Sequence, residues 1–522
     1  MRVRSVLRGV LVVLVLGAAG LGGFVWWNLH DRSPGSEFSV VVRPTPSVPA
    51  NLRVGFGRRT INPDMARPVW VAGFAHNRAA TRIHDDLKAV AAVIDDGEHR
   101  IGLVALDAIG FFHDEVLAVR RSLPSSARLD YVVVASTHNH SAPDLMGIWG
   151  PSDFRSGIDP AYRQAVVAGA AAALTDAVEA LTPAAVSFLE VPLDPAGLVA
   201  DSRDPQVFDA TLRLMHFTAP NGSTIGTIVN WADHPETPWA DNTELTADFP
   251  GYLRDALETG VTVDGRAAET GLGGVHLYVN GAIGGLMTTN PQTTVLDPYT
   301  QQPFTAPSHD KARALGRRLA QAALAAVRAG GTPVETEPRI GFAARTLELP
   351  IDNTLFRLAN ALGLFGRGQP RLNHIRSEVA VLTFGDASLT CVPGELYPEI
   401  ANGGVERSPG ADFDLAPIEV PPLRDLMPGR VKFLVGLAND EVGYIIPKSE
   451  WDAAAPWLYG APERHYGEIN SLGPETAPLI HQALKDLWAS FAASARLSAS
   501  SSGVRRANGG AAEAAYNIAA GR

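Results

Sequence analysis

The chain alternates between short runs of apolar, often β-branched residues and longer alanine-rich stretches. The apolar runs are bounded by polar, glycine or proline residues and predict buried strands at Ala89–Asp95, Ile101–Leu106, Tyr131–Ser136, Ala185–Glu190, Thr211–Phe217, Thr224–Asn230, Val275–Asn280, Glu378–Phe384 and Val431–Leu437. The alanine-rich stretches predict helices at His113–Ser122, Pro160–Leu181, Asp248–Thr259, His309–Ala329 and Thr476–Ala493. Apolar residues lie nearly all round Pro160–Leu181, so we expect that helix to be buried. Helices that separate strands favour an α/β body with mixed β-sheets and flanking helices.

The first residues predict a membrane-crossing helix that stands apart from this body. The stretch from Gly9 to Trp27 contains no charge and is long enough to cross a bilayer as a helix. Arg2, Arg4 and Arg8 precede it, and a basic flank favours a cytoplasmic N-terminus with the body on the far side. Residues 1–30 are therefore expected to anchor an extracytoplasmic body in the membrane. The alternative is a signal peptide, whose cleavage would give a secreted protein.

Segments of biased composition flank the predicted body. Residues 31–50 are rich in proline and serine and have no apolar period, which predicts a linker. Residues 51–493 contain no internal repeat and are expected to form a single large domain. Residues 494–522 are rich in serine, glycine, alanine and arginine, which predicts a disordered tail.

Composition excludes some classes of function and ligand. The 522 residues carry a formal net charge of -11 at pH 7, and the body has no basic block, so we expect no nucleic-acid partner. The chain has a single cysteine, Cys391, which excludes an internal disulfide framework and a cysteine-rich zinc site. A metal bound here would use histidine, carboxylate or other oxygen ligands.

Potential metal ligands and acid–base groups follow four of the apolar runs. The segments are Thr137-His138-Asn139-His140-Ser141-Ala142-Pro143, Trp231-Ala232-Asp233-His234-Pro235-Glu236, Pro393-Gly394-Glu395 and Ala438-Asn439-Asp440-Glu441-Val442-Gly443-Tyr444. Functional groups often lie on loops at the carboxyl ends of strands. Each segment also has an ordinary explanation, since His234 can occupy a turn, Glu395 can be a solvated turn carboxylate and Tyr444 can be a strand aromatic. The sequence separations leave open whether the four segments meet in space.

Several segments resemble motifs of the neutral/alkaline (non-lysosomal) ceramidase family, and they occur in that family's order. They are Val54–Ile61, Arg82–Leu87, Thr137–Pro143, Ala232–Glu236, Thr246–Tyr252, Val392–Glu395, Ala438–Tyr444 and Tyr466–Pro474. The resemblance covers about Leu52 to Ala493. It implies one large catalytic domain like the N-terminal domain of those enzymes, and the remaining residues leave no room for their C-terminal β-sandwich domain.

The resemblance also implies a set of site residues. The zinc ligands of the family fall on His138, His234, Glu395 and Tyr444, and its hydrogen-bonding catalytic histidine falls on His140. Arg203 loosely matches a substrate-contacting arginine. Gly284 and Gly285 are expected either to face the substrate, through open space or backbone N–H groups, or to form a plain glycine-rich turn.

One departure from the family pattern leaves the identity of the substrate undetermined. The family carries a serine near the metal, whereas this chain has Met287 at that position and Gly285 at the acidic position. The first hypothesis is a zinc-dependent hydrolase in which a metal-bound water cleaves the amide (N-acyl) bond of ceramide or a related lipid. The alternatives are hydrolysis of another ester, amide or phosphoester, and a non-catalytic extracytoplasmic metal-binding protein.

Overall fold

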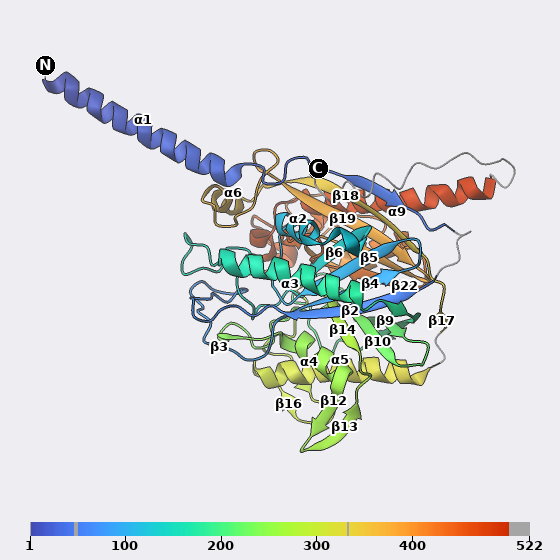
Figure 1. Ribbon diagram of the computed structural model, residues 1–522. Helices are drawn as coiled ribbons and strands as arrows, with labels where there is room; N and C mark the ends of the chain where they lie inside the picture. Colours follow the sequence, from blue (N-terminus) through green and yellow to red (C-terminus); the bar gives the residue numbers. More distant parts are fainter. Residues whose placement is uncertain (1, 46–50, 331–332, 501–522) are drawn as a thin grey trace.

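The computed structural model describes residues 2–45, 51–330 and 333–500. Within them, three five-stranded mixed sheets form the body (Figure 1). The strands of the first sheet are, in order, β6 (Tyr131–Ser136), β5 (Arg100–Leu106), β4 (Lys88–Asp95), β2 (Arg53–Thr60) and β7 (Thr182–Pro183). Those of the second sheet are β14 (Val275–Asn280), β10 (Thr224–Trp231), β9 (Thr211–Thr218), β8 (Ala185–Pro192) and β17 (Val334–Glu335). Those of the third sheet are β1 (Ser39–Val42), β18 (Ile340–Pro350), β19 (His374–Phe384), β20 (Ala387–Cys391) and β22 (Val431–Val435).

Helices cover the outer faces of the three sheets. The helices are α2 (His113–Ser122) and α3 (Pro160–Glu179) on the first sheet, α4 (Asp248–Thr259) and α5 (His309–Ala329) on the second, and α9 (Thr476–Ser500) on the third. The inner faces share one apolar core, to which Val54, Phe217 and Phe384 each bring a side chain from a different sheet. The predicted single α/β body with mixed sheets and flanking helices is confirmed.

The remaining elements are short, apart from the N-terminal helix. They are α1 (Arg2–Leu29), β3 (Arg82–Ile83), β11 (Glu244–Leu245), β12 (Gly260–Val263), β13 (Arg266–Thr270), β15 (Val295–Leu296), β16 (Pro303–Phe304), α6 (Thr354–Ala361), β21 (Glu395–Leu396), α7 (Pro398–Asn402), α8 (Leu423–Leu426) and β23 (Tyr444–Ile445). Helix α1 projects from the body, and its span Leu7–Leu29 is apolar and long enough to cross a membrane (Figure 1). A signal sequence passes the same test of length and composition.

The edge strands of the three sheets meet, and this meeting positions the functional loops. In each sheet the two strands at one edge run parallel. These pairs are β5 with β6, β10 with β14, and β20 with β22. Asn280, at the end of β14, donates from Nδ2 to the carbonyl of Thr137, 2.7 Å away, just beyond β6. The amide of Ser136 in turn donates to the carbonyl of Leu437, which follows β22. The carboxyl ends of these strands therefore open onto one region.

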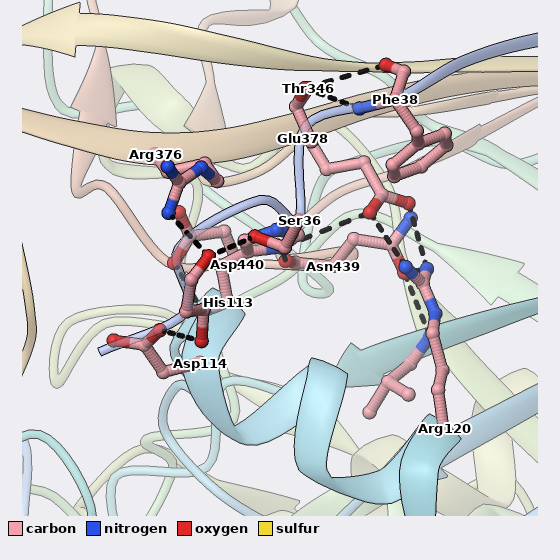
Figure 2. Close-up of polar contacts among 12 residues, drawn as sticks. Ser36, Phe38, His113, Asp114, Arg120, Thr346, Arg376, Glu378, Asn439 and Asp440 are labelled. Carbon is pink, nitrogen blue, oxygen red and sulfur yellow. Dashed lines mark hydrogen bonds and ion pairs between the residues drawn. The ribbon is translucent and has the colours of Figure 1, made fainter. Parts of the chain in front are cut away.

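A buried polar network fixes the loop that follows β22. Arg120 of α2 donates two hydrogen bonds of 2.7 Å to the carboxylate of Glu378 on β19, and the two side chains face each other in Figure 2. Asn439 accepts a hydrogen bond from the amide of Val134, 3.0 Å away. The loop that leads to Tyr444 is thus held against both the first and the third sheet.

Two expectations for the fold are corrected. Helix α3 buries only one face, which includes Val166, Ala170 and Leu174, while Gln164 and Ala165 on the other face are exposed. Alanine is short enough to be tolerated on both faces, so an alanine-rich helix does not reveal which side faces the core.

The predicted linker 31–50 and tail 494–522 are also partly ordered. Ser39–Val42 forms β1, which pairs antiparallel with β18, because three consecutive valines favour a strand at an open sheet edge. Residues 46–50 lie outside the described part of the chain. Helix α9 continues through residues 494–500, and residues 501–522 again lie outside the described part.

We expect the free energy of unfolding to fall in acid because His276 on β14 is buried. Burial lowers the pKa of this imidazole to about 4, against about 6.5 in an unfolded chain. Between these values the unfolded chain binds a proton that the native protein does not, so stability falls as the pH drops. We expect a loss of about 2–3 kcal/mol between pH 7 and pH 4 from this group alone. Urea unfolding of wild type and His276→Gln at both pH values measures it, and an equal loss in the two proteins would refute it.

Candidate metal centre and active-site cavity

Three histidines from two strand ends form a buried cluster. His138 and His140 follow β6, and His234 follows β10. Each offers one ring nitrogen, and these nitrogens all lie within 4.8 Å of one another. His138 has a φ of 65°, an uncommon backbone conformation for a residue with a side chain, and the loop therefore turns sharply to aim this ring inward.

Backbone carbonyls orient two of the three rings. Nδ1 of His138 lies 2.7 Å from the carbonyl oxygen of Ile109, and Nδ1 of His234 lies 2.7 Å from that of Met287. A carbonyl only accepts hydrogen bonds, so Nδ1 donates in both rings and Nε2 is the nitrogen that faces Glu395. This is the arrangement in which an imidazole is held ready to ligate a metal through Nε2.

A carboxylate and a phenol complete the cluster. Oε2 of Glu395 lies 3.0 Å from Nε2 of His234 and 3.4 Å from Nε2 of His138. Strands β21 and β23 are parallel and pair Glu395 with Tyr444. The Tyr444 hydroxyl lies 3.4 Å from Nε2 of His234 and 2.5 Å from the hydroxyl of Tyr466. The structure therefore brings together all four residues that the sequence indicated as metal ligands.

The electrostatics of this cluster favour a bound cation. Burial raises the pKa of Glu395, but the adjacent His138 and His234 outweigh it and hold that pKa well below its usual range. Burial lowers the pKa of His234, and the contacts with Glu395 and Glu236 more than compensate and raise it to about 9. A buried carboxylate that faces imidazole nitrogens and a phenolic oxygen offers the N and O donors that zinc accepts, so these residues fit a zinc ion.

His140 is held differently from the other two histidines. Its Nδ1 lies 3.2 Å from Oε2 of Glu236, and its ring meets the edge of Phe74 with centroids 5.2 Å apart. Among the described residues, neither ring nitrogen of His140 has a hydrogen-bond partner. Burial and the neighbouring His138 lower the pKa of His140 well below its usual value, so the ring is neutral near pH 7. A neutral imidazole with a free nitrogen is suited to proton transfer.

The cluster lines a cavity of about 750 Å³. The polar lining includes His138, His140, Glu236, Glu395 and Tyr444. Much of the remaining lining is apolar, and part of it forms one contiguous apolar cluster that contains Ile109, Phe112, Met146, Ile148, Trp149, Phe356 and Phe365. A pocket that combines polar groups with a large apolar wall suits an amphiphilic ligand.

The sequence-predicted substrate residues lie away from the cavity wall. Arg203 is 2% exposed, pairs through both terminal nitrogens with Glu468 at 3.0 and 2.7 Å, and lies over the ring of Tyr397. A Cβ on Gly284 would approach the backbone nitrogen of Tyr397 to 2.6 Å, and Gly285 has a φ of 67°. These three positions therefore have structural explanations, in an ion pair, a close approach and a turn.

Met287 serves the site through its backbone. Its side chain is fully buried in the core of the second sheet, while its carbonyl accepts from both the amide and Nδ1 of His234. Thr288, the next residue, lines the cavity. Met287 therefore helps to position His234 in the candidate metal centre, and it lies outside the cavity lining.

Substitution of Met287 should change stability more than chemistry. We expect Met287→Leu to cost less than about 1.5 kcal/mol, because the volume is conserved. Met287→Ser should cost about 2–4 kcal/mol, because it leaves a cavity and buries a hydroxyl. Denaturant unfolding of the two variants measures the difference, and turnover per folded molecule should match wild type. A gain in turnover by Met287→Ser would show that this position faces the substrate.

Sequence reasoning did not assign three of the functional positions. Glu236 contacts His140, Tyr466 contacts Tyr444, and Glu441 lines the cavity beside Glu395. Glu236 and Glu441 stand within the segments that drew attention to His234 and Tyr444. A carboxylate two residues after a ligand histidine was the available signal, and only the fold shows what it contacts.

Comparison with known proteins supports this architecture. No family model and no curated protein sequence matches the chain. Among solved structures, the neutral ceramidase from Pseudomonas aeruginosa is similar with a TM-score of 0.63 and 18% identity, over 86% of this chain and 75% of that one. A ceramidase complexed with C2 is similar with a TM-score of 0.62 and 16% identity, over 86% of this chain and 76% of that one. The chain therefore has the fold of neutral ceramidases.

Proposed function

We propose that this chain is a zinc-dependent hydrolase that cleaves the amide (N-acyl) bond of ceramide or a related lipid. The observation that carries the proposal is the convergence of His138, His234, Glu395 and Tyr444 beside a cavity with a large apolar wall. The ceramidase fold of the chain supports the same class of reaction.

In this proposal His138, His234, Glu395 and Tyr444 would hold the metal, and His140 transfers the proton. Zinc held by the four ligands would polarise the amide carbonyl and lower the pKa of water. Oε2 of Glu236 lies 3.2 Å from Nδ1 of His140, and a proton on Nδ1 would leave Nε2 of that ring as the proton acceptor. The ring can take a proton from the water that attacks the amide carbonyl, and it can then donate that proton to the leaving nitrogen. Buried Tyr444 and the more exposed Tyr466 hydrogen-bond each other, and this contact orients the Tyr444 hydroxyl beside His234.

The apolar part of the cavity supports an acyl-chain substrate. Phe112, Phe356 and Phe365 stack edge to face along it, with centroids 5.4 to 6.1 Å apart. Each methylene that such a wall removes from water contributes about 0.8 kcal/mol. A long-chain amide would therefore bind with its carbonyl at the histidines and its chain along these rings.

A second candidate is hydrolysis of a different amide, an ester or a phosphoester on the same scaffold. Met287 favours it, because the serine of the ceramidase family is replaced here. Purified full-length chain in detergent micelles should be assayed on an N-acyl-sphingosine panel and on ester, amide and phosphoester panels, each with and without chelator. Chelator-sensitive release of fatty acid from N-acyl-sphingosine supports the first candidate. Chelator-sensitive turnover of another class alone would replace it with the second.

We also propose that α1 anchors the enzyme, with its body on the extracytoplasmic side. The span Leu7–Leu29 is 23 residues of mean hydropathy 2.2, and Asn28 near its inner end is its buried residue. The alternative is a secreted enzyme from which a signal peptide has been cleaved. Mass spectrometry of the mature protein distinguishes them, because an anchored protein retains the peptides of α1 in the membrane fraction.

A further inference from the structure

Helix α6 carries apolar side chains on two different faces. Phe356 and Asn360 point to the cavity and line it. Leu355, Leu358 and Leu362 follow a spacing of three and four residues, so they share another face. Leu355 is 61% and Leu358 51% exposed. The helix therefore forms part of the cavity wall and presents an uncovered leucine face outward.

The inner end of α1 is fixed beside this helix (Figure 1). Asn28, in the last turn of α1, donates from Nδ2 to the carbonyl of Ala361 at 2.9 Å. Gly363 has a φ of 76°, and a Cβ there would lie 2.7 Å from Oδ1 of Asn28, so glycine permits this close approach. The contact joins the membrane-length helix to the wall of the cavity.

The segment that follows α1 is tied down as well. Asp31 accepts two hydrogen bonds of 2.9 Å from Arg376 on β19, and Ser33 donates to Asp114 at 2.8 Å. Ser39–Val42 then joins the third sheet as β1. No free linker separates α1 from the body in residues 30–42, so the direction of α1 fixes the orientation of the body.

From these contacts we propose that the leucine face of α6, formed by Leu355, Leu358 and Leu362, inserts into the lipid bilayer that α1 crosses. The cavity wall would then meet the membrane surface, and a lipid substrate would pass from the bilayer into the cavity beside α6. The inference rests on the proposed function and specifies how its substrate is delivered.

The bilayer is the occupant that the structure favours for this face. An apolar stripe on a short surface helix is the pattern by which a helix lies in a membrane interface. The face lies at the end of the body from which α1 projects, and α1 itself contacts α6. A protein partner or a second copy of the chain would have to cover leucines that the anchor already brings to the lipid surface.

Site-directed labelling tests the insertion without any assay of activity. Full-length Leu358→Cys, labelled with an environment-sensitive fluorophore, is reconstituted in phosphatidylcholine nanodiscs that contain phosphatidylcholine with a nitroxide on its acyl chain. The native Cys391 is fully buried and stays unlabelled. Val334→Cys is the matched control, since Val334 is 59% exposed on β17, which lies at the opposite end of the body (Figure 1). We expect several-fold stronger quenching at position 358 than at position 334, and equal quenching would overturn the proposal.

Turnover adds a second readout that separates this inference from the proposed function. The triple variant Leu355→Ser, Leu358→Ser and Leu362→Ser should hydrolyse a bilayer-embedded long-chain substrate about tenfold more slowly, while a water-soluble short-chain amide is hydrolysed at the wild-type rate. Equal rates on the embedded substrate would contradict delivery along α6. Quenching at position 358 in an enzyme that hydrolyses no amide would contradict the proposed function and still support membrane insertion of the leucine face of α6.

Discussion

Glu395→Gln will lower turnover by at least about a thousandfold, because an amide is a poor ligand for zinc and activation of the scissile bond is lost with the metal. The carboxylate lies between His138 and His234, at 3.4 and 3.0 Å from their Nε2 atoms. Steady-state assay on the best substrate of the panel gives the effect on kcat. Glutamine conserves the volume of the side chain, so the variant should fold.

The chain offers a matched control for this substitution. Glu244 lies between His84 and His309, with Oε2 3.3 Å from a nitrogen of each, and these residues form a second, more exposed cluster. Arg82 already pairs with this carboxylate at 2.8 Å. Glu244→Gln should therefore retain turnover within about twofold, as surface substitutions usually do. A parallel loss in both variants would mean that the effect is not specific to the buried site.

His140→Gln is expected to lower kcat on the order of a hundredfold to ten-thousandfold while the metal stays bound, as for loss of a proton-transfer group. Glu236 lies 3.2 Å from Nδ1 of this ring, whereas backbone carbonyls accept hydrogen bonds from Nδ1 of His138 and His234. Metal content and kcat measured on the same preparation test this assignment. Loss of the metal in His140→Gln would make His140 a third histidine ligand.

Glu236 supplies the companion measurement for this role. Because Glu236 acts by positioning His140, Glu236→Gln should lower kcat less than His140→Gln does, by about ten- to a hundredfold. A purely structural role would leave the pH profile unchanged, whereas loss of a carboxylate 3.2 Å from Nδ1 of His140 should shift the acidic limb of kcat.

Several strands could be predicted because they depend on local sequence. Strands Tyr131–Ser136 and Val275–Asn280 have the predicted bounds, since runs of apolar residues that end in polar loops determine them locally. The four candidate ligands were connected by resemblance to a known family. Their meeting is a property of the whole fold, in which the edges of three sheets come together.

Residues whose role depends on distant contacts could not be predicted in this way. Arg203 was expected at the substrate and instead pairs with Glu468, which lies 265 residues away in the chain. The prediction from sequence concerned only the side chain of Met287, whereas its backbone carbonyl is the group that positions His234. The pairing of β1 with β18 likewise joins residues about 300 apart, which no local pattern reveals.

The metal content of the purified full-length chain tests the central claim most directly. Wild type should contain about one zinc ion per chain in the buried site, and His138→Ala and Glu395→Ala should each lose it while they remain folded by circular dichroism. Glu244→Gln should retain the ion. Wild type that is free of metal and turns over substrate in the presence of chelator, or equal zinc in wild type and in both site variants, would contradict the account.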